Sequence, residues 1–374
     1  MTTITEGTSG ISSSSDRRAF YRYDRNKFSG NVARMIAAFK LRHWNFQIAY
    51  SYKTNSYAGV LKDVLESGCM IEVVSQDEYA GAVAAGFDDA RIVYNGVIPS
   101  KSKYNCAKNG GIVNVDNRDE YRMLSSMAEI DGVELRIGIR VTFDIGKGEY
   151  SRFGVNVDDG SLDALVAEID VDPHVKLCGL HCHFGSARQL EYWCDKAKVM
   201  ARLAKKYSLE YIDIGGGMYG HMEEALASQF KGYVASYETY AEAVCDQLED
   251  QHVKLIVEPG TALVGDTFSV HAHVLGIKAI GNRQIVTLDC TQSDIGYICR
   301  NYDMPIEVVA KSNAERINLE DADLMGYTCL EGDYIRRHYC GTLGIGDEIA
   351  IENVGAYSVN CCDQFICKSL EIVE

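Results

Sequence analysis

The stretch FQIAYSYKTN, residues 46–55, joins an apolar, strand-like run to a lysine. Aromatic and branched residues are frequent at positions 46–52, and the polar Thr54 and Asn55 close the run, which predicts a buried β-strand. Lys53 stands at the end of this strand. An ammonium group is costly to bury unless it is paired or loses its proton, so two interpretations are open. Either the charged end of Lys53 reaches solvent, or Lys53 has a lowered pKa and forms a Schiff base with a carbonyl compound.

Seven more short apolar runs follow, and amphipathic segments separate most of them. Eight strands that alternate with helices are typical of a parallel (β/α)8 barrel of the TIM type, with a doubly wound sheet as the alternative. This pattern predicts an α/β fold for the first part of the chain. The predicted strands lie at residues 46–52, 70–74, 91–94, 111–115, 134–141, 176–182, 211–214 and 254–257, and the predicted helices include 24–40, 58–68, 78–86, 192–207 and 233–250.

The pattern changes after about residue 259, where apolar runs follow one another without long helices between them. This predicts a second, mostly antiparallel β domain. We therefore expect a flexible tail at 1–20, a barrel at 21–258 and a C-terminal β domain at 259–374. The predicted strands of the second domain lie at residues 269–279, 283–288, 307–309, 348–352 and 364–372.

Composition narrows the class of partner. The formal net charge of −16 argues against nucleic acid and against anionic membranes, because both favour a basic surface. No apolar run is long enough to span a bilayer, and the first residues carry no basic and apolar segments of a signal peptide. The 13 cysteines are odd in number and irregularly spaced, which predicts reduced thiols in a cytoplasmic protein without a structural metal site.

Polar residues follow the ends of several predicted barrel strands, which is where barrels of this kind carry their function. Besides Lys53 these are His183, the glycines at 215–217 and Glu258. Glycines let backbone N–H groups approach an anion closely. The segment 215–220 also fits the GxGxxG fingerprint, but that fingerprint belongs to the first unit of a doubly wound domain. A lysine, an anion loop, a flat ring and a carboxylate would together suit pyridoxal 5′-phosphate (PLP).

Eight motifs then occur in one order along most of the chain: AYSYKTN (49–55), EVVSQDEY (72–79), SRFG (151–154), GLHCHFGS (179–186), DIGGG (213–217), EPG (258–260), GYTCLEGD (326–333) and GAY (355–357). With these motifs the chain resembles the fold-type III, alanine racemase-like PLP enzymes. Within them it resembles the group of ornithine, diaminopimelate and carboxynorspermidine decarboxylases.

The resemblance implies a role for each matching residue of the barrel. Lys53 would hold PLP as a Schiff base, His183 would stack on the pyridine ring, and Glu258 would keep the ring nitrogen protonated. Glu78 and Arg140 would form a supporting ion pair. The remaining cofactor-binding candidates, most of them around the phosphate, are Ser186, Gly215, Gly216, Gly217, Gly260, Thr261 and Tyr357.

The resemblance also implies a homodimer with shared active sites. In this group the residues matching Cys329 and Asp333 reach into the site of the other subunit. The implied reaction is decarboxylation of an amino acid, with Cys329 returning a proton to Cα and Lys53 releasing the amine.

Three positions depart from the pattern of the group. Leu330 replaces an acidic residue that binds substrate, Thr261 replaces the arginine that usually follows EPG, and Tyr297 stands where diaminopimelate enzymes carry another arginine. Arginine forks and acidic groups bind the charged distal end of an amino acid, so their loss disfavours meso-diaminopimelate as the substrate. The TCLxGD form is similar to carboxynorspermidine decarboxylases. Tyr297, Leu330 and Asp333 are the candidate substrate residues.

Two other functions fit the same cofactor. One is an amino-acid racemase, although racemases of this fold usually place a tyrosine opposite the lysine. The other is a non-catalytic PLP-binding or regulatory protein, although such relatives usually lose the lysine or the cysteine. Lys53 and Cys329 are both present here, which favours the decarboxylase.

Overall fold

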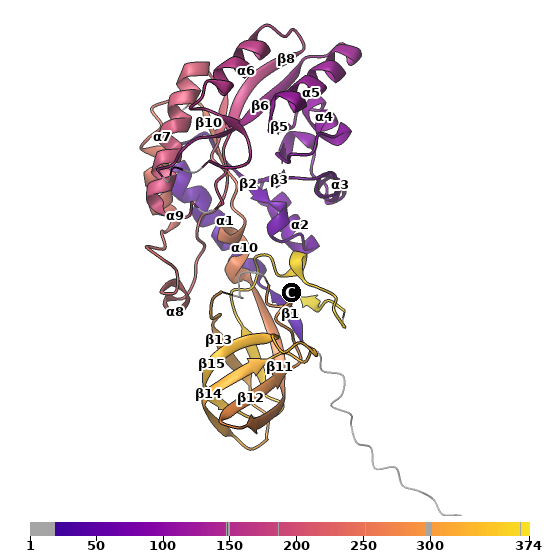
Figure 1. The fold of residues 1–374 in the computed structure, drawn as a ribbon, viewed down its shortest axis with the longest axis vertical. Coiled ribbons are helices and arrows are strands. Elements are labelled where there is room, and N and C mark those ends of the chain that lie inside the picture. Colours follow the sequence, from indigo (N-terminus) through magenta and orange to yellow (C-terminus); the bar gives the residue numbers. More distant parts are fainter. Residues whose placement is uncertain are drawn as a thin grey trace, which may run out of the picture.

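The computed structural model describes residues 19–146, 148, 150–185, 187–250, 252–296, 301–366 and 368–374. They form a barrel with its helices and a β domain at one end of it (Figure 1). None of the described helices is long and apolar enough to cross a membrane.

Eight parallel strands close into the barrel, as β5 pairs with β6 and completes the circle. The (β/α)8 prediction is confirmed, and the doubly wound alternative is wrong. Most residues of these strands are buried, since helices cover the outside and side chains fill the inside. In their order around the barrel, the strands are β5 (Ile112–Val115), β4 (Ile92–Tyr94), β3 (Met70–Val73), β2 (Phe46–Ser51), β10 (Lys254–Val257), β9 (Tyr211–Asp213), β8 (Val175–His181) and β6 (Leu135–Thr142).

Side-chain caps fix where several helices begin. Asp24 accepts a hydrogen bond from the N–H of Lys27, and Ser236 caps the helix that starts one residue later. That helix is shorter than the predicted 233–250. The described helices are α1 (Arg25–Lys40), α2 (Ala58–Glu66), α3 (Gln76–Ala84), α4 (Lys101–Lys108), α5 (Arg118–Asp131), α6 (Ser161–Asp170), α7 (Leu190–Tyr207), α8 (Glu224–Ala227), α9 (Tyr237–Cys245) and α10 (Thr261–Val264). A short strand, β7 (Val155–Asn156), extends the sheet beside β6.

The described sheet of the β domain has eight strands, six of which follow one path in the order β13 (Ile306–Ala310), β16 (Glu348–Ile351), β11 (Phe268–Ile280), β12 (Arg283–Leu288), β14 (Ile317–Met325) and β15 (Tyr334–Leu343). On this path, all neighbours are antiparallel except β12 and β14. The mostly antiparallel domain is confirmed, but the prediction missed β14 and β15. The predicted strand at 364–372 is wrong, because only β17 (Glu371–Val373) forms there.

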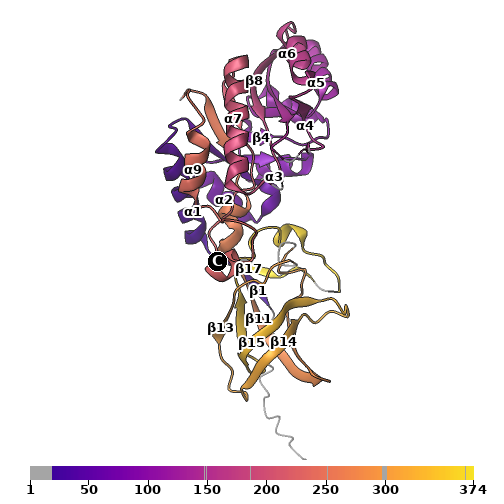
Figure 2. The same cartoon turned by 60° about the vertical axis from the view of Figure 1, so that its left-hand side comes forward.

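The first described strand, β1 (Phe20–Tyr23), belongs to the β domain. It pairs antiparallel with β11 and parallel with β17, and Figure 2 shows it beside the end of the chain. The boundary at residue 21 therefore differs from the structure, because β1 lies outside the barrel.

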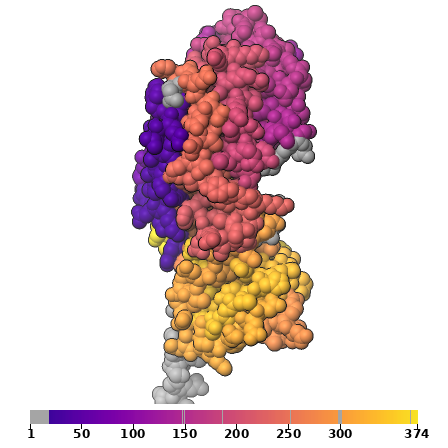
Figure 3. Space-filling model, turned by 90° about the vertical axis from the view of Figure 1, so that its left-hand side faces the viewer, coloured from indigo at the N-terminus to yellow at the C-terminus, as the bar shows by residue number. Residues whose placement is uncertain are grey.

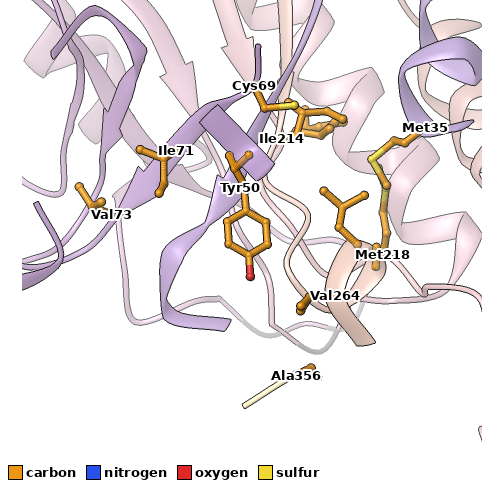
Figure 4. Packing of buried hydrophobic residues seen from close by; sticks show 14 of the residues in the cluster. Met35, Tyr50, Cys69, Ile71, Val73, Ile214, Met218, Val264 and Ala356 are labelled. Atoms are coloured by element: carbon orange, nitrogen blue, oxygen red, sulfur yellow. The ribbon is translucent and has the colours of Figure 1, made fainter. Parts of the chain in front are cut away.

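Polar contacts and apolar packing join the barrel to the β domain. In the loop after β9, Gln229 Nε2 donates to the carbonyl of Asp303 at 3.0 Å, and the ring of Phe230 stacks on Tyr302. Figure 3 shows the segment around α8 lying between the two parts. The apolar core is also continuous, and Figure 4 shows buried residues from α1, β2 and the loop after β9 above Ala356 of the β domain. The β domain is thus packed against one end of the barrel.

Candidate active site

Lys53 lies at the mouth of the barrel. Strand β2 ends at Ser51, and Lys53 is in the 3-10 turn Tyr52–Thr54 that follows. Its Nζ donates to Glu72 Oε2 at 2.6 Å, and Ser51 Oγ donates to the same oxygen at 2.7 Å. The side chain of Lys53 is 36% exposed, whereas that of Glu72 is 2% exposed. The amine therefore borders both solvent and a buried carboxylate.

The pKa of Lys53 is shifted in the opposite direction from the expected one. Burial lowers its pKa, but the carboxylates of Glu72 and Glu258 outweigh burial and raise the pKa of Lys53 above its ordinary value. The expectation of a lowered pKa is wrong for this arrangement. The reason is that the two acids come from other strands, and the sequence around Lys53 does not show them.

Glu72 is a site residue that the sequence analysis missed. It lies on β3 and is 1% exposed, and Asn95 Nδ2 approaches its second oxygen at 3.3 Å. The available signal was an acidic residue inside an otherwise apolar strand. A buried carboxylate requires partners, and here they are Lys53, Ser51 and Asn95.

Glu258 follows β10 and is buried in the same group. Its Oε1 accepts from Asn95 Nδ2 at 2.5 Å, and its Oε2 lies 3.3 Å from His181 Nε2. Burial raises the pKa of Glu258, but His181, Lys53 and His183 together bring it well below its ordinary value. Glu258 is therefore a charged carboxylate inside the barrel.

Asp213 is a second acid beside Glu258. One side-chain nitrogen of His181 and one carboxylate oxygen each of Asp213 and Glu258 all lie within 4.8 Å of one another. Asp213 Oδ1 accepts from the N–H of Gly215 at 2.9 Å, whereas its Oδ2 is buried without a partner among the described residues. Burial and the charge on Glu258 raise the pKa of Asp213 well above its ordinary value. Asp213 therefore favours its protonated form more than an exposed aspartate does.

A chain of amides orients Asn95. Asn114 Nδ2 donates to Asn95 Oδ1 at 2.8 Å, and the hydroxyl of Tyr211 donates to Asn114 Oδ1 at 2.8 Å. Because the oxygen of Asn95 is occupied, its NH2 group must point to Glu72 and Glu258. The network fixes both acids in place.

His183 presents a neutral ring. Its Nδ1 accepts from the N–H of Gly216 at 3.1 Å, which leaves the ring hydrogen on Nε2. Burial lowers the pKa of His183 to about 3, and Lys53 and Lys196 add to the effect. A neutral, fixed imidazole suits stacking against a flat cofactor ring.

Glycine is required in two loops of the mouth. A Cβ on Gly215 would lie 2.5 Å from the carbonyl oxygen of Cys182, and one on Gly216 would lie 2.3 Å from that of Glu258. A Cβ on Gly260 would lie 1.9 Å from Thr54 Oγ1. These close approaches leave no room for a side chain at the three positions. The N–H groups of Gly215 and Gly216 already donate to Asp213 and His183, so an anion here would face other N–H groups of these loops. Gly217 follows in the first loop with φ near +100°, and Thr261 begins the short helix α10 after the second.

Tyr357 reaches the mouth from the β domain. Its N–H donates to the carbonyl of Thr54 at 2.9 Å, and Asn55 Nδ2 donates to the carbonyl of Gly355 at 2.9 Å. Tyr357 has φ near +60°, a strained value for a tyrosine. Two hydrogen bonds therefore hold this loop against the lysine turn.

Several predicted residues are placed differently or not at all. Within the described chain, Glu78 and Arg140 do not form the predicted ion pair: Glu78 accepts from the N–H of Val74 at 2.8 Å, and the Arg140 guanidinium lies over the Phe153 ring. Ser186 and Tyr297 lie outside the described residues.

The loop of Cys329 is exposed and well braced. Cys329 and Leu330 face solvent, and Leu330 is 55% exposed. Asp333 is buried and accepts from the N–H of Gln292 at 2.7 Å and from the N–H and Oγ1 of Thr328 at 3.1 and 2.5 Å. Asp333 thus braces the loop, and its predicted role toward a substrate finds no support in these contacts.

The group at the mouth fits PLP. An amine, a neutral flat ring, a charged carboxylate and a glycine-lined backbone loop correspond to the aldehyde, the pyridine ring, the ring nitrogen and the phosphate of that cofactor. The buried and unpartnered Oδ2 of Asp213 and Oγ1 of Thr54 lie in the same region. Fold and site together define a PLP-binding (β/α)8 barrel with an attached β domain.

Comparison with known proteins gives the family. A sequence profile described as "Pyridoxal-dependent decarboxylase, pyridoxal binding domain" matches residues 29–265, which is more than half of the chain. The chain belongs to this family of PLP-dependent decarboxylases, which are carboxy-lyases acting on amino acids. The decarboxylase prediction is confirmed at this level, and neither the racemase nor the non-catalytic alternative gains support.

Individual relatives agree with this assignment. The diaminopimelate decarboxylase of Pseudomonas aeruginosa is 26% identical over 336 residues, covering 83% of this chain and 76% of that protein. The crystal structure of Helicobacter pylori diaminopimelate decarboxylase with L-lysine is 25% identical, with a TM-score of 0.82 over 96% of this chain and 92% of that one. The arginine decarboxylase of Paramecium bursaria Chlorella virus shares the fold, with a TM-score of 0.78 at 16% identity, over 96% of this chain and 97% of that one.

Proposed function

We propose that this enzyme decarboxylates an amino acid on PLP bound by Lys53, in active sites that two subunits of a homodimer share. The observation that carries the proposal is the geometry at the mouth, where Lys53 contacts Glu72 and shares a buried network with Glu258. Its cytoplasmic location stays a prediction.

Different residues at the mouth would bind different parts of the cofactor. His183 would pack against the ring, Glu258 would pair with the ring nitrogen, and the glycine loop at 215–217 and Tyr357 would hold the phosphate. Ser186, which lies outside the described residues, stays a predicted phosphate ligand. Bound PLP supplies an electron sink for the electron pair left when CO2 departs. The lowered pKa of Glu258 supports that role, because a charged carboxylate would keep the ring nitrogen protonated.

Lys53 must lose a proton before its amine can act as a nucleophile. Its raised pKa means that the amine carries this proton at neutral pH. Glu72 Oε2, at 2.6 Å, is the acceptor in reach. We propose that Glu72 takes the proton when Lys53 attaches the cofactor and returns it when Lys53 releases the amine product.

Cys329 of the partner subunit is proposed as the acid that protonates Cα. The support is its exposure on a braced loop beside an exposed leucine, an arrangement suited to insertion into another surface. In a two-fold dimer the same loop of each subunit would complete the site of the other.

Mixing two inactive variants tests the shared site. Lys53→Ala and Cys329→Ala should each abolish or strongly reduce CO2 release, and their mixture should recover activity because a heterodimer contains one site with both residues intact. Cys340→Ala, another exposed cysteine of the β domain, is the matched control. A mixture that stays inactive, although mass measurement shows exchanged subunits, would refute sharing.

The substrate is proposed to be an amino acid, or a carboxylated polyamine, whose distal end is less charged than that of meso-diaminopimelate. The support is Leu330, an apolar residue next to Cys329, and Thr261 at the cofactor loop. The names of the curated relatives point to meso-diaminopimelate instead. CO2 release should therefore be measured with meso-diaminopimelate, lysine, ornithine, arginine and carboxynorspermidine. The highest kcat/KM on meso-diaminopimelate would overturn this part of the proposal.

A further inference from the structure

Lys196 is a buried lysine to which the site described above gives no role. It lies on α7 among buried, mostly apolar residues, and it is 0% exposed. Its Nζ donates to the carbonyl of Ile214 at 3.2 Å and lies 3.4 Å from the centre of the Trp193 ring. No ion pair joins it to an acid of the described chain. A buried cation with neutral partners is costly unless an anion nearby balances it.

The contact with Ile214 places this cation at the base of the glycine loop. Ile214 follows the last residue of β9, and Gly215 turns the chain into the loop with φ near +69°. Lys196 thus approaches the loop from helix α7, which covers the outside of the barrel (Figure 1).

The acids that face Lys196 leave its charge only partly balanced. On β9, burial and Glu258 raise the pKa of Asp213 well above its ordinary value, which disfavours its charged form. After β8, burial raises the pKa of the Cys182 thiol to about 12, so this thiol carries no charge at neutral pH. Glu258 is charged, but Asn95 and His181 occupy its oxygens. Burial lowers the pKa of Lys196 to about 8, which keeps most of it charged at pH 7.

The remaining neighbours are uncharged. His183 beside the loop is neutral because burial lowers its pKa to about 3. On the side of helix α9, Tyr240 packs its ring against Trp193, and burial raises the pKa of Tyr240 far above neutrality. No other anion among these groups can pair with the cation.

We propose that Lys196 is a positioning residue for the cofactor, whose buried charge at the base of the Gly215–Gly217 loop favours a phosphate dianion in that loop. The inference rests on the proposed placement of the PLP phosphate there. It assigns to one residue of α7 part of the discrimination between PLP and unphosphorylated pyridoxal. Since α7 is outside the barrel, Lys196 would act on the phosphate through its electrostatic field and through the position of the Ile214 carbonyl.

The test compares binding of PLP and of pyridoxal to the full-length protein freed of cofactor. Lys196→Met removes the charge and the hydrogen bond, whereas Lys196→Gln removes the charge and keeps a donor for the Ile214 carbonyl. We expect both variants to weaken PLP by about tenfold, which corresponds to about 1.4 kcal/mol, and to leave pyridoxal within about twofold. Lys198→Met, at an exposed position of the same helix, should change neither ligand.

Two results would overturn the proposal. If Lys196→Gln binds PLP as tightly as the unmodified protein, the hydrogen bond rather than the charge matters. If PLP and pyridoxal weaken equally, Lys196 only packs the helix. An unmodified protein that binds pyridoxal as tightly as PLP would instead refute the phosphate placement of the proposed function, and this result needs no variant.

A pH series on the unmodified protein gives a second readout that does not depend on the folding of a variant. The phosphate of PLP stays a dianion above about pH 7. Effects of Lys53 cancel in the ratio of the two affinities, because both ligands carry the aldehyde. The preference for PLP should fall as the pH rises through about 8, where Lys196 loses its proton, and it should be flat in Lys196→Met. A flat ratio in the unmodified protein contradicts the proposal.

Discussion

Replacing Lys103 by methionine should destabilise the barrel strongly. Lys103 on α4 and Glu120 on α5 form an ion pair with both side chains 0% exposed. Lys103 Nζ donates to Glu120 Oε1 at 2.6 Å and to the carbonyl of Gly96 at 2.8 Å. Methionine fills a similar volume, so the cost comes from the charge and not from a cavity.

The magnitude follows from what the substitution leaves behind. Glu120 keeps one hydrogen bond, from the N–H of Asp116 at 2.7 Å, and its other oxygen stays buried without a partner. Removing one partner of a buried ion pair costs about 3–5 kcal/mol, because the remaining charge is uncompensated. The additional loss of the bond to Gly96 adds about 1 kcal/mol. A second substitution, Glu120→Gln, should restore part of this loss because it removes the isolated charge.

Urea unfolding at constant protein and cofactor concentration measures the effect as a shift of the first transition. The matched control is Lys108→Met, which breaks the exposed pair with Asp131, whose side chains are 40% and 37% exposed. Such pairs contribute only about 0–1 kcal/mol. If Lys103→Met costs no more than Lys108→Met, the argument from burial is refuted.

Three further predictions concern the mouth of the barrel. Glu72→Gln should move the pH profile for capture of PLP by Lys53 to lower pH. The reason is that the amine is a nucleophile only above its pKa, and Glu72 raises that pKa. An unmoved profile in stopped-flow absorbance would contradict this. Gly260→Ala should weaken PLP binding in a titration, because the added Cβ would clash with Thr54 Oγ1. A second substitution in the same chain, Thr54→Ala, should restore part of the affinity. If it restores none, the clash is not the cause. Glu258→Gln should lower kcat for CO2 release by about 10²-fold or more, since it removes the charge that holds the ring nitrogen protonated, and a loss below about threefold would speak against that role.

The sequence predicted the barrel well because its strands are short apolar runs separated by capped helices. The search for apolar runs missed β14 and β15, because charged and exposed residues interrupt both strands. Their pairing with each other and with β12 supplies the stability that their composition does not indicate. The segment at 364–372 shows the opposite error, where an apolar composition did not give a long strand.

Within the site, the positions of Lys53, His183 and Glu258 followed from the rule that polar residues at strand ends share one rim. The pKa of Lys53 did not follow, because Glu72 and Glu258 come from distant parts of the chain. Burial of Asp333 in its own loop also depends on contacts that the motif alone does not show.

The pairing of β1 with β11 has a consequence for synthesis on the ribosome. Phe20 lies opposite His271, so the whole barrel is translated between the two partners. At about 5–20 residues per second, β1 waits for β11 on the order of tens of seconds. Its other neighbour, β17, is translated later still. During that interval β1 is an unpaired edge that other nascent chains can join. The barrel can fold as one continuous segment in the meantime, while the β domain is completed only when β1 meets β11 and β17.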